Sequence, residues 1–117
     1  MTRTLPAVLV AALLAGCWQK DVGRTYYASG NVKTEATVKN NVLEGHAVTY
    51  YESGRKMSEA DYRAGMLNGV AVAYYESGRK KAEANYKDGV LHGPSTTWNE
   101  QGVVQNTARF DEGRLAP

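Results

Sequence analysis

The sequence predicts an all-β protein, an elongated single-layer antiparallel β-meander of stacked hairpins preceded by a helical signal peptide. The first observation is a repeat, because tyrosine pairs, glycines and leucines each recur at a step of 24 residues. The others are two turn signals in every repeat and an alternation of residue types between the turns. A fixed period of this length indicates a repeat architecture. The tyrosine pairs are Tyr26-Tyr27, Tyr50-Tyr51 and Tyr74-Tyr75, with Trp98 where a fourth pair would begin.

Residues 1–16 are expected to form a lipoprotein signal peptide. The apolar run 7–14 is too short to span a bilayer, which takes about 20 residues, but it suits the core of a signal peptide. It ends in Leu14-Ala15-Gly16-Cys17, which holds the only cysteine of the chain. This string resembles the lipobox of bacterial lipoproteins, which implies cleavage between Gly16 and Cys17 and acylation of the Cys17 thiol. An ordinary secretory signal is the alternative, because the same small residues also suit its cleavage site.

Residues 17–25 are expected to be the lipidated N-terminus and a short tether. Only Trp18 to Thr25 separate Cys17 from the first tyrosine pair, and eight extended residues reach at most about 28 Å. Two or three acyl chains would make the anchor persistent, and a tryptophan beside the lipid suits the membrane interface. The sequence therefore predicts a domain held close to a bilayer.

Residues 26–117 are expected to form the repeat domain, in which each unit contains two turns. The first turn signal is Glu52-Ser53-Gly54-Arg55, and it recurs one repeat later as 76–79. The second is a dipeptide with glycine or asparagine, residues that accept the positive φ of tight hairpin turns. The 7–9 residues between turns suit strands, and short turns make neighbouring strands antiparallel, which predicts about seven or eight strands. The units are 26–49, 50–73, 74–97 and the partial 98–117, and the dipeptides are Asn40-Asn41, Ala64-Gly65, Asp88-Gly89 and Glu112-Gly113.

The residues between the turns alternate with a period of two, as in a strand whose two faces differ. In the third unit the alternation predicts Lys81 and Glu83 on one face, with Lys80, Ala82 and Tyr86 on the other. The same rule puts the first tyrosine of each pair on one face and the second on the opposite face. One of these two aromatic rows is expected to supply the core of the sheet.

The repeated motif resembles the MORN repeat, in particular its bacterial variant. The resemblance rests on Tyr-Tyr-Glu-Ser-Gly-Arg-Lys, then Glu-Ala, Tyr and Gly-x-Leu-x-Gly, and it covers about Tyr26 to Leu115. The first unit departs from the pattern at Val38 and Asn41, and the fourth is degenerate, as terminal repeats usually are. The resemblance implies an elongated sheet of stacked hairpins. It also implies an antitoxin-like role, because some bacterial members carry that label.

Composition limits the classes of partner. Removal of the signal peptide takes Arg3 with it and lowers the formal net charge from +2 to +1. This near balance argues against the strongly basic face that nucleic-acid binding needs, so no nucleic acid is expected as a partner. With Cys17 acylated, no thiol remains for a disulfide.

No catalytic, metal or cofactor site is expected, and the protein is predicted not to be an enzyme. Ser53 and Ser77 occupy the same turn position in successive units, whereas a nucleophile needs a base of its own. His46 and His92 stand in different registers, and neither has a second ligand at metal-site spacing. A cell-wall hydrolase is disfavoured because no acid/base pair stands outside the repeat pattern.

The second tyrosines of the pairs, Tyr27, Tyr51 and Tyr75, form the candidate binding surface. An exposed tyrosine row suits a glycan or a protein partner, because the ring is apolar and the hydroxyl forms hydrogen bonds. The alternative is that these rings pack against the stems of nearby lysines and arginines. Glu35, Glu59 and Glu83 form a second ladder, for which solvated cross-strand ion pairs are the simpler interpretation.

The sequence thus predicts a membrane-anchored bacterial envelope lipoprotein with a non-catalytic repeat module for binding or scaffolding. Its partners would be the membrane, through the lipid, and a protein or an envelope glycan. Trp18 after the cysteine resembles the outer-membrane sorting pattern, so the periplasmic face of the outer membrane is expected if the cell is Gram-negative. An antitoxin or immunity-type protein that neutralises a cognate toxin is the alternative, and an export signal argues against its cytoplasmic form.

Overall fold

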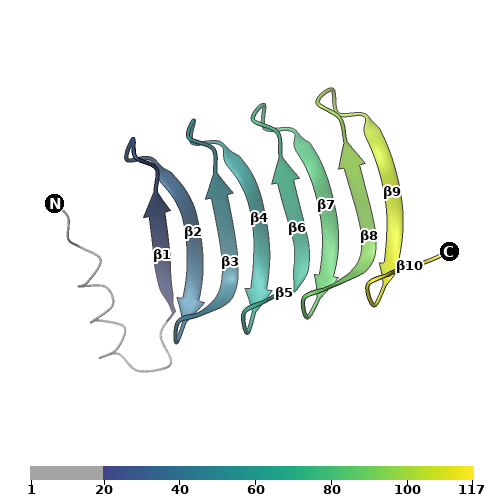
Figure 1. The fold of residues 1–117 in the computed structure, drawn as a ribbon, viewed down its shortest axis with the longest axis horizontal. Coiled ribbons are helices and arrows are strands. Elements are labelled where there is room, and N and C mark those ends of the chain that lie inside the picture. The colour runs from purple at the N-terminus through teal and green to yellow at the C-terminus, as the bar shows by residue number, and fades with distance from the viewer. Residues whose placement is uncertain (1–19) are drawn as a thin grey trace.

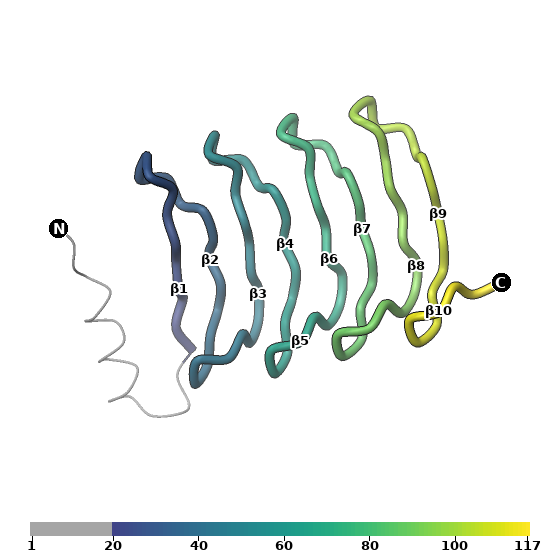
Figure 2. Tube along the Cα trace, viewed as in Figure 1, coloured from purple at the N-terminus to yellow at the C-terminus, as the bar shows by residue number. Residues whose placement is uncertain are grey.

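The computed structural model describes residues 20–117, and all of their regular structure is one antiparallel sheet (Figures 1 and 2). The predicted signal peptide 1–16 and the lipidation site Cys17 lie outside the described residues. Within 20–117, no helix is long and apolar enough to cross a membrane. The strands are β1 (Asp21–Tyr26), β2 (Val32–Lys39), β3 (Val42–Tyr50), β4 (Lys56–Arg63), β5 (Met66–Leu67), β6 (Gly69–Tyr74), β7 (Lys80–Lys87), β8 (Val90–Trp98), β9 (Val104–Asp111) and β10 (Arg114–Leu115).

The strands lie side by side in sequence order, with each hairpin stacked on the next (Figure 1). The sheet measures 50 × 33 × 14 Å along its principal axes, and the shortest of these is the thickness of a single layer. The predicted all-β meander of stacked hairpins is therefore confirmed. We call the turns 27–31, 51–55, 75–79 and 99–103 the upper turns, and 40–41, 64–65, 88–89 and 112–113 the lower turns, as they lie in Figure 1.

The sheet differs from the prediction in its first strand and in its strand count. β1 begins at Asp21, inside the segment 17–25 predicted as a tether, because its backbone pairs with β2 from Asp21↔Val38 onward. Residues 20–117 form eight long strands, the upper end of the predicted number. Two further strands, β5 and β10, are only two residues long; β5 is separate because the chain leaves strand geometry at Asn68, just before Gly69 at φ +114°.

The lower turns confirm the predicted tight hairpin geometry. Both residues of each turn have positive φ, which is the requirement of a type I′ turn. Ala64 at φ 51° and Glu112 at φ 50° adopt this conformation although neither residue type favours it. The glycines that follow them stand at φ 83°, and a Cβ on Gly113 would lie 3.1 Å from Val90 Cγ1 of the preceding unit.

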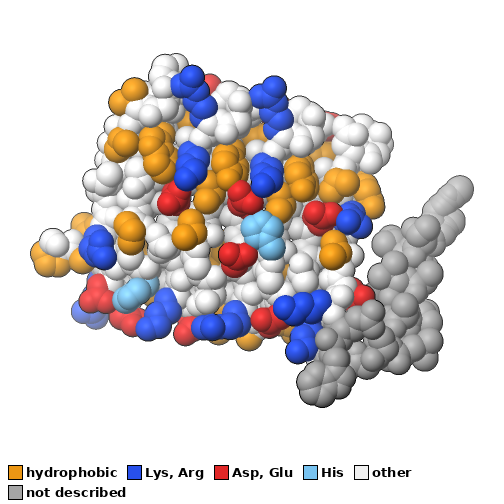
Figure 3. Space-filling view, turned by 180° about the vertical axis from the view of Figure 1, so that it is seen from behind, with side chains coloured by type: hydrophobic (Ala, Val, Ile, Leu, Met, Phe, Trp, Pro, Cys, Tyr) orange, Lys and Arg blue, Asp and Glu red, His pale blue; other side chains and the backbone are white. Residues whose placement is uncertain are grey.

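Residues that lie directly opposite each other on neighbouring strands point to the same face of the sheet. The strand register therefore assigns each residue to one of two faces, and these differ in composition. One face carries a row of small side chains across the strands; we call it the small-residue face. The other carries Glu35, Glu59, Glu83, His46 and Asp61; we call it the charged face, and Figure 3 shows its acidic and basic side chains between hydrophobic ones. The small row comprises Gly23, Ala36, Ala47, Ala60, Ala71, Ala84, Ser95 and Ala108.

A bulge below each upper turn changes the predicted facing of one lysine. The pairs Ala73↔Ala82 and Tyr74↔Lys80 leave Lys81 as an extra residue on its strand, which shifts the alternation by one position. Lys80 therefore lies on the charged face, where its Nζ is 2.7 Å from Glu83 Oε1. The prediction that Lys80 faces away from Glu83 was wrong, because simple alternation assumes a regular ladder.

No second layer covers either face of the described sheet. Val48, with 7% of its surface exposed, is the only residue of 20–117 classed as buried. The expectation that one tyrosine row forms the core was wrong, because the rings of both rows are half-buried or exposed. The fold is therefore stabilised by contacts between neighbouring units, as in other repeat proteins.

Candidate functional site

The predicted binding row, Tyr27, Tyr51 and Tyr75, links each unit to the next. Each of these tyrosines begins an upper turn and donates its hydroxyl to a backbone carbonyl one unit later. The bonds are Tyr27 to Tyr50 O at 2.6 Å, Tyr51 to Tyr74 O at 2.7 Å and Tyr75 to Trp98 O at 2.8 Å. The hydroxyls are thus already engaged within the sheet.

Two of the three rings of this row have a lysine ammonium over one face. Lys33 Nζ lies 5.6 Å from the centre of the Tyr27 ring, and Lys81 Nζ lies 5.6 Å from that of Tyr75. A cation over an aromatic face is attracted by the electron density of the ring. The tyrosines are half-buried, so part of each ring remains accessible, and their use as a partner surface stays a prediction.

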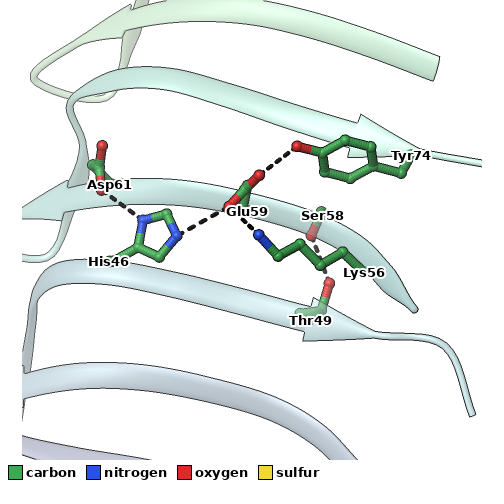
Figure 4. A network of polar contacts seen from close by, with 7 residues as sticks. All are labelled: His46, Thr49, Lys56, Ser58, Glu59, Asp61 and Tyr74. Atoms are coloured by element: carbon green, nitrogen blue, oxygen red, sulfur yellow. Dashed lines mark hydrogen bonds and ion pairs between the residues drawn. The ribbon is translucent and has the colours of Figure 1, made fainter. Parts of the chain in front are cut away.

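The charged face holds a polar network around Glu59 that the sequence pattern did not predict (Figure 4). The Glu59 carboxylate accepts hydrogen bonds from the Tyr74 hydroxyl and from Lys56 Nζ at 3.2 Å. His46 stands between two carboxylates, with Nε2 3.1 Å from Glu59 Oε1 and Nδ1 2.8 Å from Asp61 Oδ1. Three strands, β3, β4 and β6, contribute to the network.

This network shifts the pKa values of three of its members. The hydrogen bond to Asp61 raises the pKa of His46, and the second bond to Glu59 acts in the same direction. The hydrogen bond from Tyr74 lowers the pKa of Glu59. The same bond raises the pKa of Tyr74 to about 12, because the phenolate would face a carboxylate.

His46 is the distinctive member, because the equivalent positions of the neighbouring units hold Val22 and Val70. Two carboxylates lie beside His46, although neither stands at metal-ligand spacing from it in the sequence. The hairpin register provides the missing signal: the upper turn at 51–55 places His46 opposite Asp61 and next to Glu59. Within residues 20–117, no group of three or more histidine, cysteine, aspartate or glutamate side chains is placed to hold a metal ion.

The other residues singled out in the sequence have local roles. The Oγ atoms of Ser53 and Ser77 lie 3.4 Å from the backbone nitrogens of Arg55 and Arg79, within their own turns. His92 Nδ1 accepts a hydrogen bond from the backbone nitrogen of Glu112 at 3.3 Å. The serines therefore serve the turns in which they stand, at the same position of successive units.

We expect the His46→Gln variant to lose a pH-dependent part of the stability. The pKa of His46 is raised above its ordinary value of 6.5, so its contribution is complete below that value and is lost as pH rises through the folded-state pKa. Because the side chain is 51% exposed, the contribution should be at most about 1 kcal/mol. Urea unfolding at about pH 5.5 and about pH 8.5 should show a larger wild-type advantage at the lower pH. An equal advantage at both would contradict the assigned ion pairs.

A comparison with protein-family models agrees with the repeat geometry. The family model described as "MORN repeat variant" matches residues 22–40, 43–64 and 67–88, which correspond to the hairpins β1–β2, β3–β4 and β6–β7. No curated protein matches the chain. Among solved structures, "Crystal structure of accessory secretory protein 1,2 and 3 in Streptococcus pneumoniae" is similar over 86% of this chain, with 18% identity and a TM-score of 0.45. The chain spans 19% of the length of that structure's matched chain. Because the family model covers more than half of the sequence, the chain belongs to the MORN repeat variant family.

Proposed function

We propose that the protein is a bacterial envelope lipoprotein, anchored through Cys17, whose repeat sheet binds or scaffolds a partner without catalysing a reaction. The sheet itself supports the binding role. Its two faces present different sets of repeated side chains, and in residues 20–117 no second layer covers either face. Repeat proteins commonly use such extended surfaces for binding. The partner would be a protein or a glycan of the envelope.

The position of β1 supports a close attachment to the membrane. β1 begins at Asp21 and runs from the lower turns towards the upper turns (Figure 1). Three residues, Trp18 to Lys20, then remain between Cys17 and the sheet, and they reach at most about 11 Å. This is shorter than the tether expected from the sequence. In the proposed arrangement the lower turns lie nearest the bilayer, at the periplasmic face of the outer membrane if the cell is Gram-negative.

Metabolic labelling with radioactive palmitate tests the anchor. We expect the wild type to incorporate the label and to sediment with membranes, whereas Cys17→Ala should incorporate none, because the thiol is the acceptor. Cys17→Ser is the matched control, since it changes one atom of the side chain and should also lose the label. Label retained by both variants would refute acylation at Cys17 and leave the ordinary secretory signal as the better interpretation.

A further inference from the structure

The charged face has a shallow hollow at its C-terminal end, beside the last upper turn. Arg79, Lys80, Trp98 and Gly102 line it, and its volume of about 400 Å³ is largely open to solvent. In Figure 3 basic side chains stand next to hydrophobic ones at the end of the sheet farthest from the grey residues. The hollow lies outside the polar network around Glu59 and outside the tyrosine row that links the units.

Trp98 distinguishes the last unit from the preceding ones, which have a tyrosine at the equivalent position. It occupies the position of Tyr74, but an indole has no hydroxyl that could bind the glutamate of the preceding unit as Tyr74 binds Glu59. Glu83 keeps the bond from Lys80, at 2.7 Å, that Glu59 has from Lys56, and Lys80 Nζ also lies 5.9 Å from the centre of the Trp98 ring. The hollow therefore combines a flat apolar ring with a cation held in place beside it.

Arg79 supplies a second cation to the hollow. Its equivalent in the preceding unit, Arg55, has hydrogen-bond partners that can be compared with those of Arg79. The equivalent Arg55 donates through Nη1 to the carbonyls of Glu76 and Ser77, at 3.2 and 3.0 Å. Across residues 20–117, the Arg79 guanidinium forms neither a hydrogen bond nor an ion pair. Its Nη1 lies 3.3 Å from where a Cβ on Gly102 would be, so any larger residue there would press on the guanidinium.

The chemistry of these groups selects an anionic ligand with a ring. An arginine guanidinium binds a carboxylate through two parallel hydrogen bonds, and a tryptophan offers an apolar face against which a sugar ring can stack. A site that encloses a small molecule buries most of its surface, whereas this hollow is open. An open site suits one residue of a longer chain that continues across the sheet.

We propose that the hollow binds a carboxylate-bearing sugar within an acidic glycan chain, with the ring on Trp98 and the carboxylate on the Arg79 guanidinium, beside the Lys80–Glu83 ion pair. The proposal deepens the proposed function, because the envelope location supplies the glycan. It names a partner class for the charged face and leaves the tyrosine row as a link between units.

Isothermal titration calorimetry of the full chain in detergent tests the site, with tri-galacturonate as the probe. We expect the wild type to bind it, and Trp98→Ala and Arg79→Gln each to raise Kd about tenfold or more. The fully methyl-esterified trisaccharide should bind as weakly to the wild type as tri-galacturonate binds to Arg79→Gln. Arg55→Gln is the matched control: the same residue type changes in the preceding upper turn, and Kd should stay within about twofold.

Three outcomes would overturn the proposal. They are no binding by the wild type, equal binding of the methyl ester, or equal binding of a tetraglutamate peptide, which would show that charge alone is recognised. Circular dichroism of each variant shows whether it is folded. If Trp98→Ala does not fold, Trp98→Tyr replaces it in the test, because it introduces the residue that the other units have at this position. The palmitate experiment has its own outcome, so failure of this site and failure of the membrane anchor are distinguishable.

Discussion

The Gly93→Ala variant is expected to lower the free energy of unfolding by about 2–4 kcal/mol. Gly93 has φ +113°, a conformation that costs residues with a Cβ about 1–3 kcal/mol. The new methyl carbon would also lie 3.2 Å from Asn85 Cβ on the adjacent strand, so the bulge between β7 and β8 would have to move. For a domain of this size the midpoint of thermal unfolding should fall by about 10 °C or more, measured by circular dichroism.

Gly23→Ala is the matched control for that substitution. Gly23 also lies within a strand, but it does not have a positive φ, and a Cβ at this position would have Ala36 O as its nearest neighbour, 4.0 Å away. The free energy of unfolding should therefore change by no more than about 0.5 kcal/mol. Equal losses for the two variants would show that the glycine conformation at position 93 is not required.

The Tyr51→Ala variant is expected to lower the free energy of unfolding by about 2–3 kcal/mol. The change removes a half-buried ring from the junction between two units, together with the hydrogen bond to Tyr74 O. Tyr51→Phe keeps the ring and removes only that bond, so it should cost about 1 kcal/mol. Urea unfolding of the two variants separates ring packing from hydrogen bonding.

These expectations change how the predicted partner surface has to be tested. Tyr51→Ala and Tyr75→Ala alter the contacts between units, so weaker capture of a partner by these variants would not by itself show that the rings bind it. Tyr26→Ala is a useful comparison, because Tyr26 is 54% exposed and its loss should cost less than the loss of Tyr51. A stability loss for Tyr26→Ala as large as that for Tyr51→Ala would contradict the linking role.

Most of the fold could be predicted because each unit repeats the same local signals. The dipeptides at the lower turns determine tight hairpins, as the φ values of Asn40, Asn41, Gly65 and Gly89 confirm. The 24-residue step then aligns equivalent residues across the sheet, which places the two tyrosine rows on opposite faces. The family comparison confirms the repeat, and residues 20–117 form the stacked hairpins that the period predicts.

The network around His46 was missed because it is made between strands. His46 is 15 residues from Asp61 and 13 from Glu59, which is no recognisable metal or catalytic spacing. The two carboxylates meet the histidine only after the hairpin has closed with Val48 opposite Glu59. Counting outward from the upper turn would have found these pairs, but the bulge beside the turn, which moved Lys80 to the charged face, makes such counting unreliable near the turn.

By itself, the sequence determined the strand–turn rhythm, the antiparallel order and the predicted acylation motif, because these depend on residues close together in the chain. Only the tertiary structure decided that Tyr51 links two units, that His46 lies between two carboxylates and that Arg79, within residues 20–117, is left without the partners of Arg55. The physical reason is that a hydrogen bond between neighbouring units depends on the register and the bulges of a whole sheet. A period of 24 residues specifies which units are neighbours, whereas side-chain reach and backbone irregularity decide which atoms meet.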